Sequence, residues 1–209
     1  MIRIENTDIV GLEHAIRGAR NPMNSWAKSD SSSELTGYCV GKNDHDLMMK
    51  LRNAGTDHRK FMRMITVYAD ITAPLYWWKE FDTYKVGTVA NSCSTMHKIH
   101  DKEFELDDFS HEHLLEQDEK ALNYIVDYLN INRRSYLDTK DKTYWWQMIQ
   151  LLPSSYNQKR TVMLNYEVLA NIYKSRKDHK LDEWRSLCDW IETLPYGELI
   201  TGEDNGDTV

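Results

Sequence analysis

Residues 62–85, MRMITVYADITAPLYWWKEFDTYK, place a strand pattern directly before a helix pattern. Every second residue from Ile65 to Ile71 is apolar, which is the period of a β-strand with one buried face. Pro74 suits the first turn of a helix, because its fixed φ fits there and the N–H that it lacks is not needed. We expect this helix to continue to about Tyr84. A strand that runs straight into a helix predicts a compact α+β unit.

Helical periodicity dominates the sequence outside this stretch. Apolar residues recur at intervals of three or four, which predicts further helices over residues 43–55, 112–129, 162–172 and 181–191. Asn43 and Asp44 are read as the polar N-cap of the first of these. With few strands and no internal repeat, the sequence indicates a helix-rich α+β protein with a single domain over residues 1–201, followed by an acidic flexible tail at 202–209.

The negative charge of the protein is concentrated in one segment. The 209 residues include 26 Lys and Arg against 33 Asp and Glu, a formal net charge of −7. Residues 101–120, the acidic segment, hold nine of these acids and two lysines, so they account for the whole net charge. Residues 51–100 are mildly basic, which suits a local anion site but not the dense basic surface that nonspecific nucleic-acid binding requires. We therefore expect no bulk nucleic-acid binding.

Composition also disfavours membrane and metal-binding classes. No apolar run approaches the roughly 20 residues that span a bilayer, and the first residues lack the layout of a signal peptide, so we expect a soluble cytoplasmic protein. Cys39, Cys93 and Cys188 are widely separated, which indicates free thiols. The histidines have no third ligand at metal-binding spacing, so no metal site is expected.

Three groups of side chains suit ligand binding. The loop 82–98 is rich in hydroxyls, with a glycine and flanking lysines, which fits a phosphate but is equally typical of an ordinary polar loop. The second group consists of polar residues that interrupt an otherwise apolar helix pattern, and an ordinary exposed helix flank would have the same pattern: Lys159, Arg160, Asn165, Asn171, Arg176 and His179. The third group is His58 and Arg59 with His97 and His100. The pairs Trp77-Trp78 and Trp145-Trp146 indicate core or an oligomer interface.

Residues 65–98 resemble the flavin-dependent thymidylate synthases. In that family a strand leads to Ala-Pro, an aromatic-rich helix, Arg-His-Arg, seven residues and a serine. The Arg-His-Arg triplet falls on Thr83-Tyr84-Lys85, and the later Asn-Glu-x-Ser-x-Arg-Tyr falls on residues 91–97 after one inserted residue. The turn at residues 55–61 is also similar. The likeness is weakest at residues 5–42 and in the acidic segment. From residue 152 to about residue 190 it runs without a gap, at Leu152-Pro153, Lys159, Asn165, Leu169, Asn171, Arg176, Asp178 and, offset by one place, Trp184.

The resemblance implies a fold, an assembly and a set of ligands. The fold is α+β with a small, mainly antiparallel sheet, and the assembly is a homotetramer whose sites are shared between subunits. The ligands are FAD, the nucleotide dUMP, NADPH and methylenetetrahydrofolate. Reduced flavin mediates transfer of the folate carbon to uracil C5, and no enzymic cysteine acts as nucleophile.

Carried over position by position, the resemblance assigns roles to seven residues. Arg176 is the catalytic residue, which meets the uracil and polarises it, because a guanidinium stabilises charge that develops on a carbonyl. Ser94 and Lys159, together with Arg176, bind the nucleotide, the first two at its phosphate. The flavin is lined by His58, Lys85, Asn165 and Asn171.

The sequence departs from the family pattern at several charged positions. Thr83 and Tyr84 replace an arginine and a histidine, and Met96 replaces the arginine that meets the nucleotide. Ser92 replaces a glutamate, and Glu167 stands where an arginine is usual. Each lost charge-assisted contact is worth about 1.5–3 kcal/mol, so we expect weak FAD binding. Two hypotheses follow: a divergent enzyme acting on a dUMP-like nucleotide, and a non-catalytic oligomeric nucleotide-binding or interaction protein on the same scaffold.

Overall fold

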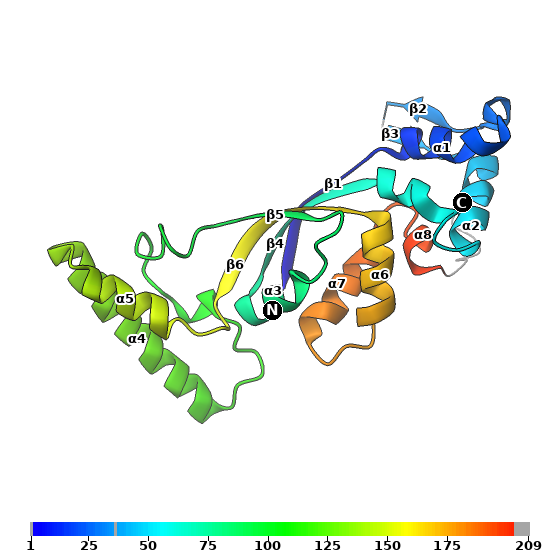
Figure 1. The fold of residues 1–209 in the computed structure, drawn as a ribbon. Coiled ribbons are helices and arrows are strands. Elements are labelled where there is room, and N and C mark those ends of the chain that lie inside the picture. The colour runs from blue at the N-terminus through cyan, green and yellow to red at the C-terminus, as the bar shows by residue number, and fades with distance from the viewer. Residues whose placement is uncertain (1, 36, 203–209) are drawn as a thin grey trace. The chain divides into compact units, whose positions relative to one another are not determined.

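The computed structural model describes residues 2–35 and 37–202 (Figure 1). Helices make up about half of the chain and strands are fewer, which confirms the predicted α+β class. Apart from Gly202, the acidic tail predicted at 202–209 lies outside the described residues. Within the described ranges, no helix combines the length and the apolar character needed to cross a membrane.

Within the described residues, four strands form an antiparallel sheet. In spatial order it consists of β1 (Arg3–Val10), β4 (Thr66–Pro74), β6 (Asn157–Asn165) and β5 (Val89–Ser92). A separate short hairpin pairs β2 (Ser32–Glu34) with β3 (Gly37–Cys39), with Ser33 opposite Tyr38. The small antiparallel sheet is therefore confirmed.

The strand and helix predicted from residues 62–85 are both present. β4 begins at Thr66 rather than Met62, because a 3₁₀ turn, η3 (Arg59–Met64), precedes it. The alternate apolar residues that define the strand are buried: Val67, Ala69, Ile71 and Ala73. α3 (Leu75–Phe81) follows without a loop, as Pro74 predicts. It ends before Tyr84, and the hydroxyl of Thr83 donates to the carbonyl of Glu80 at that end.

The helix predicted over residues 162–172 is partly wrong. Val162 to Asn165 belong to β6, and α6 (Tyr166–Arg176) begins one residue later. Val162 and Leu164 are both buried, which is the two-residue period of a strand. Asn165 marks the change, because its side chain accepts a hydrogen bond from the Val168 N–H at 3.0 Å and so caps α6.

The other predicted helices form with shifted ends. The observed helices are α2 (Lys42–Asn53), α4 (Glu116–Thr139) and α7 (Asp182–Glu192). The N-cap expected at Asn43 and Asp44 is wrong, because the side chain of Asp30 accepts from the N–H groups of both residues. The remaining elements are α1 (Leu12–Arg20), η1 (Asn21–Met23), η2 (Trp26–Lys28), η4 (Leu106–Asp108), α5 (Lys142–Leu151) and α8 (Glu198–Thr201).

The described chain divides into two compact units. The α4 unit comprises Met1–Ile4, Asp70–Thr83 and Ala90–Thr161, and the α6 unit comprises Glu5–Ala69, Tyr84–Val89 and Val162–Val209. Each unit is described by itself below. The single domain expected over residues 1–201 stays a prediction.

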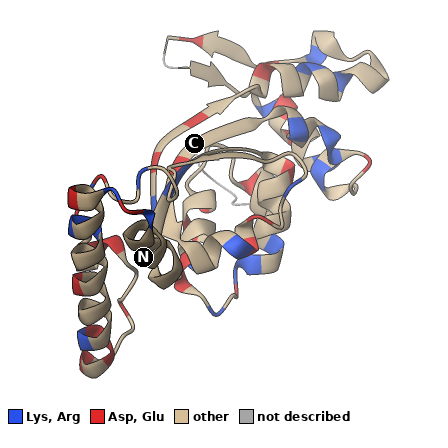
Figure 2. Ribbon diagram, turned by 60° about the vertical axis from the view of Figure 1, so that its left-hand side comes forward, with Lys and Arg blue, Asp and Glu red and all other residues tan. Residues whose placement is uncertain are grey.

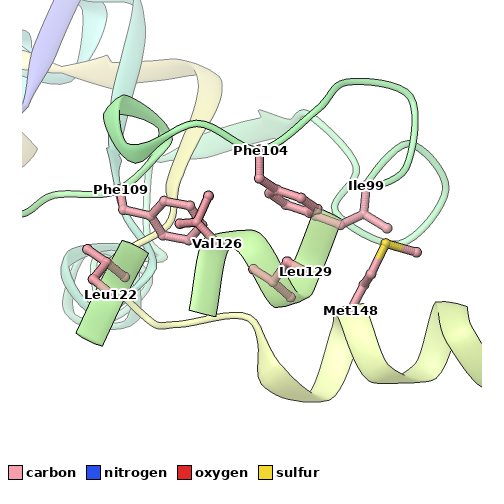
Figure 3. Close-up of a cluster of buried hydrophobic side chains, with 7 residues drawn as sticks. All are labelled: Ile99, Phe104, Phe109, Leu122, Val126, Leu129 and Met148. Atoms are coloured by element: carbon pink, nitrogen blue, oxygen red, sulfur yellow. The ribbon is translucent and has the colours of Figure 1, made fainter. Parts of the chain in front are cut away.

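The core of the α4 unit includes apolar side chains of the acidic segment. α4 and α5 are neighbouring helices that reverse direction at Lys140, which has a positive φ. The inner faces of these helices, the acidic segment and the residues before it together form one cluster of buried apolar side chains: Ile99, Phe104, Phe109, Leu122, Val126, Leu129 and Met148 (Figure 3). The Asn130 side chain also bonds both the N–H and the carbonyl of Phe104. The apolar residues of this segment therefore anchor it to α4.

The tryptophan pair on α3 belongs to the core, as one of the two predicted readings had it. Trp77 and Trp78 are 0% and 1% exposed and meet edge to face, with ring centroids 4.8 Å apart. The Trp78 indole N–H donates to the carbonyl of Gln158 at 2.9 Å. In contrast, Trp146 on α5 is 48% exposed.

A buried ion pair joins α1 to α2 in the α6 unit. The Asp44 carboxylate, 0% exposed, accepts from the Arg20 Nε at 2.5 Å. The hydroxyls of Ser29 and Ser31 each donate to the same carboxylate at 2.6 Å. The N–H groups of Asp30 and Ser31 donate to it at 3.1 Å. These bonds fasten the segment between the two helices to the Asp44 side chain of α2.

Candidate functional site

Arg176 lies against two aromatic rings within the α6 unit, an arrangement called the aromatic pocket below. It is the last residue of α6, and its Nε donates to the Tyr84 hydroxyl at 2.9 Å. Its guanidinium carbon lies 4.6 Å from the centroid of the Trp184 ring and 5.7 Å from that of the Tyr84 ring. The guanidinium is therefore held both by a hydrogen bond and by cation–π contact, which limits its orientations.

The pocket is built on a rigid base. Trp184 is fully buried on the inner face of α7 and packs edge to face with Tyr84, at 5.9 Å between centroids. His179, in the loop that joins α6 to α7, meets the same indole at 6.2 Å. Basic residues gather in the last turn of α6 and in this loop (Figure 2). Such a surface favours an anionic ligand.

A second cluster pairs η3 with α6 in the same unit. Glu167, with a side chain 7% exposed, accepts from the Arg59 Nε at 3.4 Å and also from the Nε of Arg63. Arg59 reaches further and donates to the Asn171 Oδ1 at 3.2 Å. The two arginines and Lys60, their neighbour in sequence, carry three positive charges against the two negative charges of Glu167 and of Asp57, which also interacts with Arg63. Glu167 is thus neutralised by its neighbours rather than presented as bare charge.

Asn165 and the loop before β5 lie together. Gly87 has φ +77°, and a Cβ there would lie 2.7 Å from the Nδ2 of Asn165. Only glycine allows both this backbone conformation and this approach. Lys85 and His58, the other predicted flavin residues of this unit, are exposed.

The predicted phosphate residues lie in the α4 unit. The Lys159 ammonium lies 3.1 Å from the Asp70 carboxylate, which also accepts from the Thr161 hydroxyl at 2.6 Å. The Lys159 carbonyl accepts from the Cys93 N–H at 2.9 Å, so the chain reaches Ser94 immediately beside it. The Ser94 hydroxyl accepts from the N–H groups of Met96 and His97 and shapes the turn there.

The structure therefore brings the predicted residues together in separate groups. In the α4 unit, the bond from the Cys93 N–H to the Lys159 carbonyl brings the neighbouring Ser94 close to Lys159. Arg59 brings Asn171 to Glu167, Asn165 contacts the Gly87 loop, and Arg176 has its own aromatic pocket. Lys98 and Arg160, also basic residues of this region, are paired with Asp101 and Asp82, each at 2.8 Å.

Sequence reasoning missed the residues that hold Arg176. The sequence indicates Trp184 as an apolar helix residue and a matched position, and Tyr84 as a departure from a histidine, but neither as a contact of Arg176. Tyr84 and Arg176 are 92 residues apart, so spacing alone carries no signal for their contact. Among the residues that the structure describes, no three His, Cys, Asp or Glu side chains gather as metal ligands would.

Comparison with solved structures identifies the fold. Thymidylate synthase X (ThyX) from Helicobacter pylori, solved with FAD and dUMP, superimposes with a TM-score of 0.70 over 97% of this chain and 98% of that one, at 18% identity. The chain has the ThyX fold. A UMP/dUMP methylase, PolB from Streptomyces cacaoi, bound with 5-Br UMP, matches 92% of this chain and 87% of that one, with a TM-score of 0.61 at 12% identity.

The likeness is one of fold and is not found in the overall sequence. No family model matches the sequence, and no curated protein matches it. The structural likeness to ThyX nevertheless covers nearly the whole of both chains, so it includes the α6–α7 region as well as the sheet. The fold implied by the sequence motifs is thereby confirmed.

Proposed function

We propose that this protein binds a pyrimidine deoxynucleotide such as dUMP, with Arg176 at the base. The observation that carries the proposal is the Tyr84–Trp184 pocket, which fixes the guanidinium at the end of α6. A fixed guanidinium is suited to the carbonyl of a uracil, because it loses little conformational entropy when it donates hydrogen bonds. The solved ThyX and PolB structures contain dUMP and 5-Br UMP, which supports this ligand class.

Within the proposal, Lys159 and Ser94 contact the nucleotide phosphate. An ammonium and a hydroxyl are suitable partners for it. Asp70 holds Lys159 until the phosphate competes for the same ammonium. We also propose, as the resemblance implies, a homotetramer in which subunits share the nucleotide and cofactor sites.

The residues present also fit an anionic cofactor such as FAD. Arg59, Lys60 and Arg63 outweigh Glu167 in charge, which suits a diphosphate. Asn171 is held by Arg59, and His58, the residue before Arg59, is exposed, as is Lys85. FAD, when bound, would supply the redox chemistry for transfer of a carbon from methylenetetrahydrofolate. NADPH would be the reductant. The departures at Thr83 and Tyr84 leave this cofactor site weaker than the family pattern.

Substitution of Arg176 tests the nucleotide proposal. We expect Arg176→Ala to weaken dUMP binding by about 10–150-fold, the equivalent of about 1.5–3 kcal/mol for a lost charge-assisted contact. Tyr84→Phe keeps the ring but removes the hydroxyl that orients Arg176, so we expect a smaller loss of about 2–10-fold. Isothermal titration calorimetry measures both.

The matched control is Arg17→Ala. Arg17 is an exposed arginine near the end of α1 that contacts His14, so its removal should leave dUMP affinity unchanged. Equal affinity in Arg176→Ala and the unsubstituted protein would remove Arg176 from the site.

A cation restored at residue 83 tests the weakness of the flavin site. We expect the unsubstituted protein to bind FAD weakly and Thr83→Arg to tighten binding by about 10-fold or more, because it returns one charge-assisted contact. Quenching of FAD fluorescence measures this. Thr139→Arg is the control, since Thr139 also lies at the end of a helix and donates to a carbonyl one turn back. Tight stoichiometric FAD in the unsubstituted protein would contradict the prediction.

A second candidate function is that of a non-catalytic oligomeric protein, which uses the same scaffold for nucleotide binding or for interaction with another partner. It is favoured by Met96, which stands at the position of the nucleotide-contacting arginine, is 46% exposed, and binds the Trp145 indole N–H through its carbonyl. Its side chain supplies no charge to a nucleotide. Release of tritium from dUMP labelled at C5, in the presence of FAD, NADPH and methylenetetrahydrofolate, distinguishes the enzyme from the non-catalytic protein.

A further inference from the structure

The side-chain amide of Asn171 is held in one orientation by Arg59. The Arg59 Nη2 donates to the Asn171 Oδ1 at 3.2 Å. A guanidinium has only donors, so it bonds the oxygen of an amide and not the nitrogen. Asn171 is exposed, and among the residues that the structure describes its Nδ2 has no hydrogen-bond partner. Asn171 therefore leaves its two N–H donors available to a ligand.

Arg59 is in turn oriented by Glu167. Glu167 and Asn171 are four residues apart on α6, so they lie on the same face of the helix. The Arg59 Nε donates to the Glu167 Oε1 at 3.4 Å while its Nη2 reaches Asn171, so one guanidinium spans both side chains. The other carboxylate oxygen, Oε2, accepts from the Nε of Arg63, which limits rotation of the carboxylate.

The exposed fraction rises along these contacts. The Glu167 side chain is 7% exposed, the Arg59 side chain is 20% exposed, and Asn171 is an exposed residue. The buried carboxylate is thus the fixed end of the network, and the amide is the end that a ligand can reach. An amide that is already oriented loses less conformational entropy when it binds.

We propose that Glu167 and Arg59 are positioning residues, which present the N–H groups of Asn171 to a hydrogen-bond acceptor of the flavin. This inference rests on the cofactor site of the proposed function. The acceptor is an oxygen, either a carbonyl of the isoalloxazine ring or an oxygen of the diphosphate. Although Glu167 stands where the family pattern has an arginine, it supports flavin binding here because it orients Arg59.

Variants of Asn171 test which end of the amide meets the ligand. Asn171→Ala removes the amide, whereas Asn171→Asp keeps an oxygen for Arg59 but has no N–H donor. We expect both variants to bind FAD about 10-fold more weakly, and Asn171→Asp to bind riboflavin no more tightly than Asn171→Ala. Quenching of flavin fluorescence measures both. Unchanged FAD affinity in Asn171→Ala, or tighter riboflavin binding in Asn171→Asp than in Asn171→Ala, would overturn the proposal.

Two partial ligands identify the acceptor. Riboflavin has the ring without the diphosphate, and ADP has the diphosphate without the ring, so Asn171→Ala should weaken the binding of one of them. A loss for neither would contradict the proposal. Asn53→Asp is the matched control, because Asn53 is exposed and its Oδ1 also accepts from an arginine, Arg52, at 3.1 Å. It adds the same charge and should leave the affinity for uncharged riboflavin unchanged.

Exchange of Arg59 for lysine tests the positioning. Arg59→Lys keeps the charge but loses the planar fork that spans Glu167 and Asn171. We expect FAD binding to weaken by about 5-fold in Arg59→Lys, and no further loss when this substitution is added to Asn171→Ala, because no amide is left to orient. A structural or purely electrostatic role would give the same loss in both backgrounds and would refute positioning. Arg17→Lys, the same exchange at an exposed arginine of α1, should have no effect.

Glu167→Gln gives a test of opposite sign. If Glu167 only repelled an anionic cofactor, its neutralisation would tighten FAD binding, whereas loss of an oriented Arg59 should weaken it by about 2–5-fold. Circular dichroism melting checks that the variant folds, and tighter binding by the folded variant would overturn the proposal. Calorimetric titration of dUMP on the same samples separates the two proposals. An unsubstituted protein that binds dUMP but not FAD would refute this inference and leave the nucleotide proposal intact.

Discussion

Replacement of Asp44 by asparagine is expected to destabilise the protein by about 3–5 kcal/mol, the usual cost of breaking a buried ion pair. Asp44 is 0% exposed and Arg20 is 4% exposed, so the substitution leaves the Arg20 guanidinium buried without its counter-charge. It also replaces a carboxylate oxygen that accepts from both Ser29 and Ser31. Urea unfolding followed by circular dichroism measures the free-energy change.

The same carboxylate gives this stabilisation a pH dependence. Burial acts to raise the pKa of Asp44, but hydrogen bonds from Ser29, Ser31 and Arg20 outweigh it, so the pKa lies below its ordinary value of 3.8. A pKa that is lower in the folded state stabilises the fold above the unfolded pKa, and this contribution is lost as the pH falls through the folded value. The expected loss therefore lies below about pH 4.

Asp46→Asn is the control for Asp44→Asn. Asp46 lies on the same helix, is 62% exposed, and pairs loosely with Lys42 at 3.9 Å, so its loss should change stability by less than about 0.5 kcal/mol. If the two variants have the same stability, the buried pair is not the fastening between α1 and α2 that its geometry indicates.

The sequence predicts the elements whose period is unambiguous. β4 follows from its alternate apolar residues, and α3 follows from Pro74. α7 follows from an apolar face that includes Trp184 and Ile191, which are both buried. Residues 162–165 of β6 fall in a predicted helix because Val162, Asn165 and Val168 are three residues apart. This spacing fits a helix, although Val162 and Asn165 lie on a strand. Long-range pairing in the sheet decides that segment, and a local period does not report it.

The sequence identifies candidate site residues but not the side chains that they contact in the structure. The sequence points to Arg176, Asn165, Asn171 and Lys159, yet it treats Glu167 as a charge that repels an anion. In the structure Arg59 and Arg63, more than 100 residues earlier, neutralise that charge. Glu167→Arg would therefore place three arginines together and disturb η3, so Thr83→Arg is the cleaner restoration of a cation. Such pairings are set by tertiary contacts that one sequence does not record.

The last prediction concerns Trp184, where stability and the proposed site meet. We expect Trp184→Ala to cost about 3–5 kcal/mol of stability, because the indole is 0% exposed and its removal leaves a cavity between α6 and α7. The variant also removes the ring on which the Arg176 guanidinium lies at 4.6 Å. Trp26→Ala is the control, since Trp26 is 50% exposed and contacts Asn21, so its loss should change stability little.

Trp184→Phe separates the two effects. Phenylalanine keeps an aromatic face and most of the volume, so we expect a smaller loss of stability than in the alanine variant and a folded protein at 25 °C. Because the weaker cation–π contact holds Arg176 less firmly, dUMP binding measured by calorimetry on this folded variant should fall by about 2–10-fold. Unchanged dUMP affinity in folded Trp184→Phe, together with a normal loss in Arg176→Ala, would show that Arg176 does not need the indole to meet the base. Unchanged stability in Trp184→Ala would contradict the packing of α7 itself.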